Sequence, residues 1–212
     1  GSALTLTATL SVATTSAVTV AINTSGSAVE GTDYSTISDI TIAAGSTSGT
    51  ASFTVTDDSV YEGSEAATVS IGTVTGSSAS AAGSGTSVSI TLSDNETAPT
   101  VNLSSSSSNV LEDGSAITVT ATLSNVADEA VTVPINTSGT ATEGTDYAAI
   151  SDITISAGAT TGSTTITPTD DNVSEGAETL IVSFGTLSGA AATAGSTASL
   201  TLSLIDDDVP NI

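Results

Sequence analysis

The stretch ITVTATL at residues 117–123 decides the fold, because apolar and polar residues alternate along its whole length. A period of two places the apolar side chains on one face of an extended strand and the threonines on the other face. The stretch LTLTATL at residues 4–10 has the same pattern, 113 residues earlier. Both places are therefore predicted to form half-buried β-strands.

The similarity between the two stretches extends through most of the chain. Shifted by 113 residues, the sequence matches itself without gaps from Gly1 to about Thr91. Shared segments are INTSG at 22–26 and 135–139, EGTDY at 30–34 and 143–147, and ISDITI at 37–42 and 150–155. A repeat of this length has the size of a domain rather than of a solenoid rung, which indicates a tandem duplication.

Further alternating runs occur in both copies, separated by clusters of Gly, Ser, Asn and Asp. No segment has a convincing helical period. About seven short antiparallel strands per copy predict an all-β fold of two tandem immunoglobulin-like β-sandwiches. We expect the domains to cover residues 1–98 and 99–212.

The second copy opens with residues 101–113, which have no counterpart before Gly1. The chain ends with residues 209–212, which resemble the start of that opening segment and suggest a further repeat. Two interpretations remain open. The chain is cut from a longer array, or the first sandwich takes its first strand from a neighbouring molecule.

The charge of the chain restricts its partners and its chemistry. There are 23 Asp and Glu residues and no Lys, Arg or His, for a formal charge of -23. Phosphate contacts depend on cationic side chains, so neither nucleic acid nor an anionic lipid surface is an expected partner. No run approaches the roughly 18 apolar residues of a membrane span. Because His, Cys and Lys are all absent, we do not expect an enzyme.

One acidic pattern occurs twice, as DDSVYEGSE at residues 57–65 and DDNVSEGAE at residues 170–178. Two carboxylates about 4 Å apart repel by roughly 4 kcal/mol at an effective dielectric constant of about 20. Without basic side chains, protonation or bound cations must relieve this repulsion, and cations are favoured at neutral pH. Ca²⁺ accepts about six to eight oxygen ligands from irregular loops, whereas zinc, copper and iron sites favour His or Cys.

Acids outside these clusters have simpler interpretations. Glu30 and Glu143 each precede a glycine and are expected to cap a turn rather than bind metal. Asp39 and Asp152 precede strand signals and are expected to be turn or surface residues.

Together with GTDY at residues 31–34 and 144–147 and DDD at residues 206–208, the acidic pattern resembles a Calx-β domain. That family includes the calcium-sensing domains of sodium–calcium exchangers and repeats of large bacterial surface adhesins. The resemblance covers essentially the whole chain and implies a calcium cluster at one pole of each sandwich. In the first copy it implies the ligands Asp33, Asp57, Asp58, Glu62, Glu65 and Asp94. In the second copy it implies Glu112, Asp146, Asp170, Asp171, Glu175, Glu178, Asp206, Asp207 and Asp208.

The first copy departs from the family pattern in two places. DNE at residues 94–96 replaces the three closing aspartates, and no acid precedes Gly1. The number of calcium ions that the first copy binds, and their affinity, therefore do not follow from the resemblance.

These expectations lead to a functional hypothesis: a calcium-binding structural repeat pair of a secreted or cell-surface adhesin or filament. Calcium would rigidify the domains and their junction, near residues 94–100. One alternative is a self-assembling subunit of an extracellular fibre or surface layer, joined by strand exchange. Another is a calcium-regulated module that binds a protein or glycan. The expected location is extracellular or on a bacterial cell surface, with neighbouring repeats, identical subunits, or a surface protein or glycan as partners.

Overall fold

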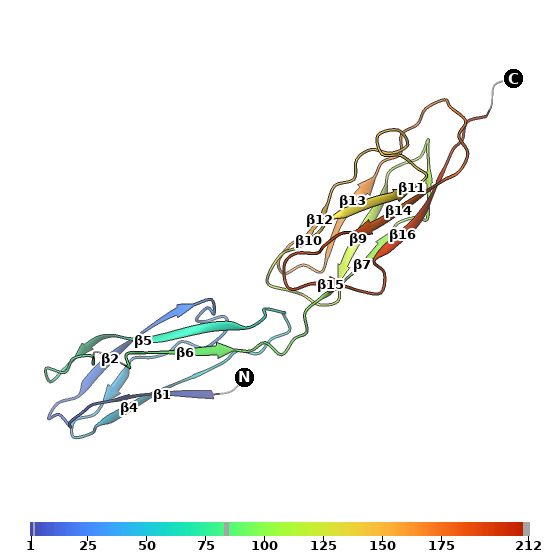
Figure 1. Cartoon of the computed structure of the whole chain (residues 1–212). Helices are drawn as coiled ribbons and strands as arrows, with labels where there is room; N and C mark the ends of the chain where they lie inside the picture. Colours follow the sequence, from blue (N-terminus) through green and yellow to red (C-terminus); the bar gives the residue numbers. More distant parts are fainter. Residues whose placement is uncertain (2, 83–84, 210–212) are drawn as a thin grey trace. The chain divides into compact units, whose positions relative to one another are not determined.

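The computed structural model describes residue 1, residues 3–82 and residues 85–209. It consists of two compact units, Gly1–Asp58 with Gly63–Asp94, and Ser59–Glu62 with Asn95–Ile212 (Figure 1). Every helix or strand assigned in the described residues is a β-strand, which confirms the all-β expectation. That part of the chain contains no helix with the length and apolarity needed to cross a bilayer.

The described part of the first unit forms one four-stranded sheet and one strand pair. Its strands are β1 (Ala3–Thr9), β2 (Val18–Gly26), β3 (Ile40–Ile42), β4 (Ser48–Thr54), β5 (Glu65–Thr75) and β6 (Ser87–Leu92). The sheet has the order β3-β2-β5-β6, and β1 pairs with β4, all antiparallel. Buried Tyr34 and Phe53 meet edge to face, with ring centroids 5.8 Å apart, in an otherwise aliphatic core.

The second unit has a fuller set of strands. They are β7 (Thr100–Ser105), β8 (Asn109–Leu111), β9 (Ile117–Leu123), β10 (Val131–Val133), β11 (Ile135–Gly139), β12 (Ile153–Ile155), β13 (Thr161–Ile166), β14 (Glu178–Phe184), β15 (Thr193–Ala194) and β16 (Ser199–Ile205). One sheet has the order β13-β9-β7-β15 and the other β11-β14-β16-β8, while β10 pairs with β12. Pro134, which lacks a backbone N–H, separates β10 from β11.

The strand that first indicated the fold behaves in the second unit as its alternation predicts. The apolar side chains of β9 are all at most 8% exposed, and they join the core of this sandwich. The tandem immunoglobulin-like sandwich expected from the alternation is therefore confirmed. Two short pairings, β15 with β7 and β16 with β8, are parallel, which a period of two cannot reveal.

The gap-free match expected to about Thr91 is wrong in the last strand of each copy. Val69 pairs with Val88, and its counterpart Val182 pairs with Leu200. Val88 therefore corresponds to Leu200, and the chain between the paired residues Val69 and Val88 is one residue longer than the chain between Val182 and Leu200. Surface loops tolerate such insertions because few packed side chains are displaced.

The glycine that ends β11 is expected to be indispensable. Gly139 has a φ of +126°, and a Cβ there would lie 2.2 Å from the carbonyl oxygen of Thr179. Gly139→Ala combines this clash with backbone strain, so we expect a loss of more than about 3 kcal/mol in the free energy of unfolding.

Gly144→Ala is the matched control for urea unfolding of this variant. Gly144 also has a positive φ, +87°, but no atom lies within 4 Å of the added Cβ. Only backbone strain remains there, so the expected loss is about 1 kcal/mol. Equal losses in the two variants would show that the close approach to Thr179 does not matter.

Candidate metal centre

Acidic residues from separate segments of the second unit meet at one place. Asp146 lies in the loop after β11, Glu175 precedes β14, and Glu178 is the first residue of β14. Each of these residues offers one carboxylate oxygen, and the three oxygens lie within 4.8 Å of one another. Oxygens at this separation are close enough to share a single cation.

A small cavity adjoins this group. Its volume is about 10 Å³, and its lining consists of Glu112, Asp146, Glu175, Gly176, Glu178, Leu204, Ile205 and Asp206. This is room for about one water-sized particle. Five of the nine ligands implied in the second copy thus border one space.

The loop that carries Asp146 is held by that residue's own side chain. The Asp146 carboxylate accepts a hydrogen bond from the backbone N–H of Thr142, and the Asp146 N–H donates to the Thr142 carbonyl oxygen. Asp146 is only 9% exposed, and the neighbouring Tyr147 is buried in the core. This anchoring fixes the orientation of the Asp146 carboxylate, which also shares a hydrogen bond with Glu178.

Asp206 has a similar anchoring role at the end of β16. Its Oδ2 accepts hydrogen bonds from the N–H groups of Glu175, at 2.7 Å, and Gly176, at 2.9 Å. Its Oδ1 accepts a third from the N–H of Asp208, at 2.8 Å. Together these bonds hold the pKa of Asp206 below its usual range. The bond from Gly176 has the largest effect on this pKa, and the bond from Asp208 comes next. Asp206 therefore ties the loop of residues 170–178 to β16 as a stable anion.

Other members of the acidic set repel one another. Loss of hydration is the first cause that raises the pKa of Glu178, followed by its hydrogen bond to Asp146 and the charges of Asp146, Glu175 and Glu112. Loss of hydration and neighbouring carboxylates also raise the pKa of Glu112, Glu175 and Asp208. No basic side chain exists in the chain to offset this repulsion.

One oxygen in this set has no hydrogen-bond partner. The Oδ2 atom of Asp208 is buried and unpaired among the residues that the structure describes. Asp208 also experiences the charges of Asp206, Asp207, Asp171 and Asp170. A buried anionic oxygen among like charges is costly unless a cation satisfies it. The donor set contains oxygen only and therefore fits a hard cation such as Ca²⁺.

Glu112 and Asp171 are also brought together. The backbone N–H of Asp171 donates to Oε1 of Glu112 at 3.2 Å, which ties the loop of residues 170–178 to the end of β8. Asp170 and Asp207 are exposed. They lie near enough to Asp208 for their charges to raise its pKa.

The first copy repeats part of this arrangement. Asp33 and Glu65, the counterparts of Asp146 and Glu178, each offer a carboxylate oxygen within 4.8 Å of the other. Asp94 accepts a hydrogen bond from the N–H of Gly63 at 2.9 Å, as Asp206 does from Gly176. Glu62 directly precedes Gly63, at the position of Glu175.

Two further implied ligands of the first copy lie at the surface, as Asp170 does in the second copy. Asp57 and Asp58 are exposed residues that follow β4. In the second copy, Glu112 and Asp206 also border the cavity beside the acidic group. Glu112 reaches this cavity from the end of β8, a strand that the described first unit lacks.

Glu30 accepts hydrogen bonds from other parts of its own domain rather than from the turn beside Gly31. Its Oε1 accepts a hydrogen bond from the N–H of Ile37 at 3.2 Å, and its Oε2 accepts one from the hydroxyl of Thr24 at 2.9 Å. Both oxygens are therefore occupied within the protein.

Asp39 and Asp152 have a specific role that their sequence positions did not reveal. Asp39 accepts a hydrogen bond from the N–H of Ile22 at 3.0 Å, next to a register shift in β2. Asp152 accepts one from the N–H of Ile135 at 2.9 Å, directly after the strand break. Each carboxylate thus satisfies a backbone donor where regular pairing is interrupted. A sign of this role in the sequence is that the aspartate follows the isoleucine by 17 residues in both copies.

The raised pKa values predict how pH affects the metal-free chain. When the pKa of a carboxyl group is raised by folding, the folded state binds protons more tightly than the unfolded state does. The resulting stability is present at low pH and is lost as pH rises through the raised pKa. Glu112, Glu175, Glu178 and Asp208 act in this direction, whereas the lowered pKa of Asp206 acts in the opposite one.

We therefore expect the melting temperature of the metal-free chain to be higher near pH 5 than near pH 7. Scanning calorimetry of thoroughly demetallated protein measures this difference, and saturating calcium should reduce or reverse it. A metal-free chain that is more stable near pH 7 would contradict the inferred repulsion.

The fold and the acidic groups define a protein of tandem β-sandwiches whose loop carboxylates lie close enough together to hold a metal ion. The family model of the Calx-beta domain matches residues 3–96 and again residues 94–208. The chain therefore belongs to the Calx-beta domain family.

Several solved structures are similar to this chain. The apo form of the Calx CBD1 domain is 20% identical, with a TM-score of 0.44, covering 51% of this chain and 98% of its own. CBD12 from CALX1.2 is 14% identical, with a TM-score of 0.42, covering 95% of this chain and 92% of its own. The calcium binding domain CBD12 of CALX1.1 is 16% identical, with a TM-score of 0.40, covering 92% and 76%. No match was found among curated proteins.

Proposed function

We propose that this chain is a calcium-binding structural repeat pair of a secreted or cell-surface adhesin or filament. The observation that carries this proposal is the approach of Asp146, Glu175 and Glu178 to within 4.8 Å in a chain without a basic side chain. Bound calcium supplies the positive charge that this group needs, and it does so with the oxygen ligands that calcium prefers.

The fixed and loose parts of the site suggest how calcium rigidifies a domain. Asp146 and Asp206 are held by backbone hydrogen bonds, so their positions do not depend on a metal. The loop of residues 170–178 is mostly exposed, and it donates two backbone hydrogen bonds to Asp206 and one to Glu112. Without a cation, repulsion should loosen this loop. With shared oxygen ligands, the loop is held to the ends of β8 and β16.

The junction between the domains is expected to respond as well. Asp94, which binds the N–H of Gly63, lies a few residues before the linker at residues 97–100. Ordering of the acidic loops next to this linker would restrict the range of interdomain angles. The absence of Lys and Arg also leaves no cleavage site for a trypsin-like protease, which would be useful outside a cell.

Calorimetric titration of calcium into the metal-free chain tests the proposal. We expect measurable heat at neutral pH, and loss of at least half of the bound calcium in the double variant Glu175→Gln, Glu178→Gln, because both carboxylates belong to the group and line the cavity. Asp113→Asn removes an exposed acid outside the cavity lining and is the matched control. Small-angle scattering should show a narrower range of conformations with calcium. No heat of binding, together with unchanged scattering, would refute the proposal.

A further inference from the structure

Strands β8 and β16 lie far apart in the sequence of the second unit, but they are neighbours that run in the same direction. Their parallel pairs are Asn109 with Ser203, Val110 with Leu204, and Leu111 with Ile205. Backbone hydrogen bonds continue this ladder at both ends. The N–H of Ser203 donates to the carbonyl oxygen of Ser108 at 2.9 Å, and the N–H of Glu112 donates to that of Ile205 at 3.0 Å.

Tension along the chain acts on this pair lengthwise. The linker enters the second unit beside β7 at one end, and β16 leads to the other end (Figure 1). A pull on both sides of the unit draws β7 and β8 back toward the linker and draws β16 away from it. Because β8 and β16 are parallel neighbours, this pull slides one strand along the other and loads the bonds between them together. Strands pulled apart from one shared end would instead separate one bond at a time.

The candidate metal group lies where these two strands end. Glu112 directly follows β8, Asp206 directly follows β16, and both border the cavity of the acidic group. The loop of residues 170–178 already bridges them, because it donates one backbone hydrogen bond to Glu112 and two to Asp206. Sliding by one residue would move Glu112 about 3.3 Å relative to Asp206. This is longer than a calcium–oxygen bond of about 2.4 Å, so one ion cannot keep both ligands after such a slip.

We propose that the second unit is a load-bearing module in which β8 and β16 form a shear clamp, fastened by calcium at the acidic group. The shear geometry rests on the strand pairing alone, whereas the role of calcium rests on the proposed function. An ion bound by both Glu112 and Asp206 joins the ends of the two loaded strands. Unfolding under tension then requires the ion–ligand contacts and the strand ladder to break together. Because the unfolding rate governs forced unfolding, the fastened clamp slows the response of the unit to load.

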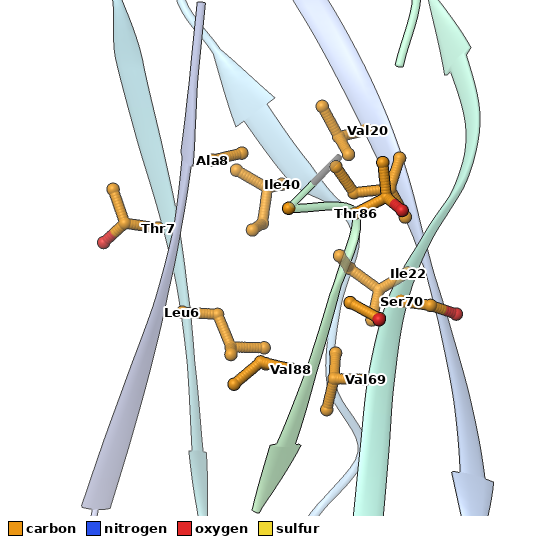
Figure 2. A pocket seen from close by; sticks show the side chains of 13 residues that line it. Leu6, Thr7, Ala8, Val20, Ile22, Ile40, Val69, Ser70, Thr86 and Val88 are labelled. Atoms are coloured by element: carbon orange, nitrogen blue, oxygen red, sulfur yellow. The ribbon is translucent and has the colours of Figure 1, made fainter. Parts of the chain in front are cut away.

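The described residues of the first unit have a different arrangement around β6. An apolar groove of about 150 Å³ lies among β1, β2, β5 and β6. Figure 2 shows Leu6 and Val88 pointing toward each other across this groove. The described partner of β6 is β5, which runs antiparallel to it. The clamp is therefore inferred for the second unit, and its test applies force to that unit alone.

Pulling the full chain from different attachment points tests the clamp. The chain has no cysteine, so handles attach only to introduced cysteines. Val209→Cys, after β16, carries one handle in every variant. The other handle is at Ser108→Cys, directly before β8, or at Ser115→Cys, a few residues after it. All three positions are exposed, and the two serines flank the same strand.

A pull between residues 108 and 209 loads β8 and β16 lengthwise, whereas a pull between residues 115 and 209 separates their ends. At one constant force in chelator, we expect the lengthwise pull to unfold the second unit at least about tenfold more slowly. The rates are compared after correction for any difference in the free energy of unfolding, measured in urea without handles. Equal rates, or faster unfolding in the lengthwise pull, would overturn the shear clamp.

Calcium provides the second comparison. In the lengthwise pull, saturating calcium is expected to slow unfolding by a further factor of at least about ten. Glu112→Gln should remove most of this gain but leave the rate in chelator nearly unchanged, because its amide oxygen can still accept the bond from Asp171. Asp113→Asn is the matched control and should keep the gain, since Asp113 does not line the cavity.

The outcomes separate this inference from the proposed function. If calorimetric titration detects calcium binding and the lengthwise rate does not change, the fastening role is wrong although the chain binds calcium. A calcium effect that survives Glu112→Gln would also overturn that role. If no calcium binds, the proposed function fails, and the contrast between pulling directions in chelator still decides whether β8 and β16 form a shear clamp.

Discussion

Removing calcium from the chain is expected to lower its melting temperature by more than about 15 °C at neutral pH. A ligand that binds only the folded state stabilises it by about 4 kcal/mol when its free concentration is about 1,000 times its Kd. In domains of roughly 100 residues, a change of about 1 kcal/mol shifts the melting temperature by about 4–8 °C. The oxygens of Asp146, Glu175 and Glu178, brought close only by folding, provide the selectivity for the folded state.

Scanning calorimetry in calcium and in EDTA measures this difference. Sodium chloride at matched ionic strength is an essential control, because salt also screens a chain with a formal charge of -23. Magnesium is a second control, since it prefers fewer carboxylates and retains its waters. Superimposable curves in calcium and EDTA would exclude calcium as a structural element of these domains.

Glu178→Gln is expected to have effects of opposite sign with and without calcium. Loss of hydration, the hydrogen bond to Asp146 and nearby carboxylates raise the pKa of Glu178. An uncharged side chain of the same size removes this repulsion, so the metal-free variant should melt at a higher temperature than the parent. Loss of a ligand charge should weaken calcium binding by at least tenfold, so the calcium-bound variant should melt at a lower temperature.

Melting curves and calcium titrations of the variant measure both effects. Asp113→Asn removes one negative charge from an exposed position and should leave both melting temperatures nearly unchanged. Glu65→Gln makes the equivalent change in the first copy and should repeat the pattern there. A Glu178→Gln chain that is less stable in both conditions would identify Glu178 as a purely structural residue.

Strand alternation predicted most of the sandwich, and its failures have physical causes. The alternating runs that became β2, β9, β14 and β16 were expected, because the apolar residues of each run face the core of its own sandwich. Strand β13, with the sequence TGSTTI, has no such alternation and forms because it pairs with β9 along its full length. The two-residue strand β15 likewise depends on its neighbour β7. Backbone pairing of this kind leaves little trace in side-chain sequence.

The acidic group was only partly predictable, because part of it also depends on pairing between distant strands. The spacing of Asp170, Glu175 and Glu178 is visible in the sequence, whereas the approach of Glu112 and Asp206 to them depends on two strands from distant parts of the chain. The separate roles of the acids were not visible at all. Asp206 is an anion anchored by backbone donors, while Glu178 is a repelled carboxyl, although both belong to similar acidic runs.

Sequence alone determined the periodicity of the strands, the duplication and the net charge, because each is a property of residue order or composition. It thereby determined that each copy builds a sandwich and that its loops collect acids without counter-charges. Only the tertiary structure decided which acids meet at one cavity and which short strands pair in parallel. Both outcomes follow from pairings between strands far apart in the chain, and contacts of that kind are set by packing of the whole domain rather than by any local pattern.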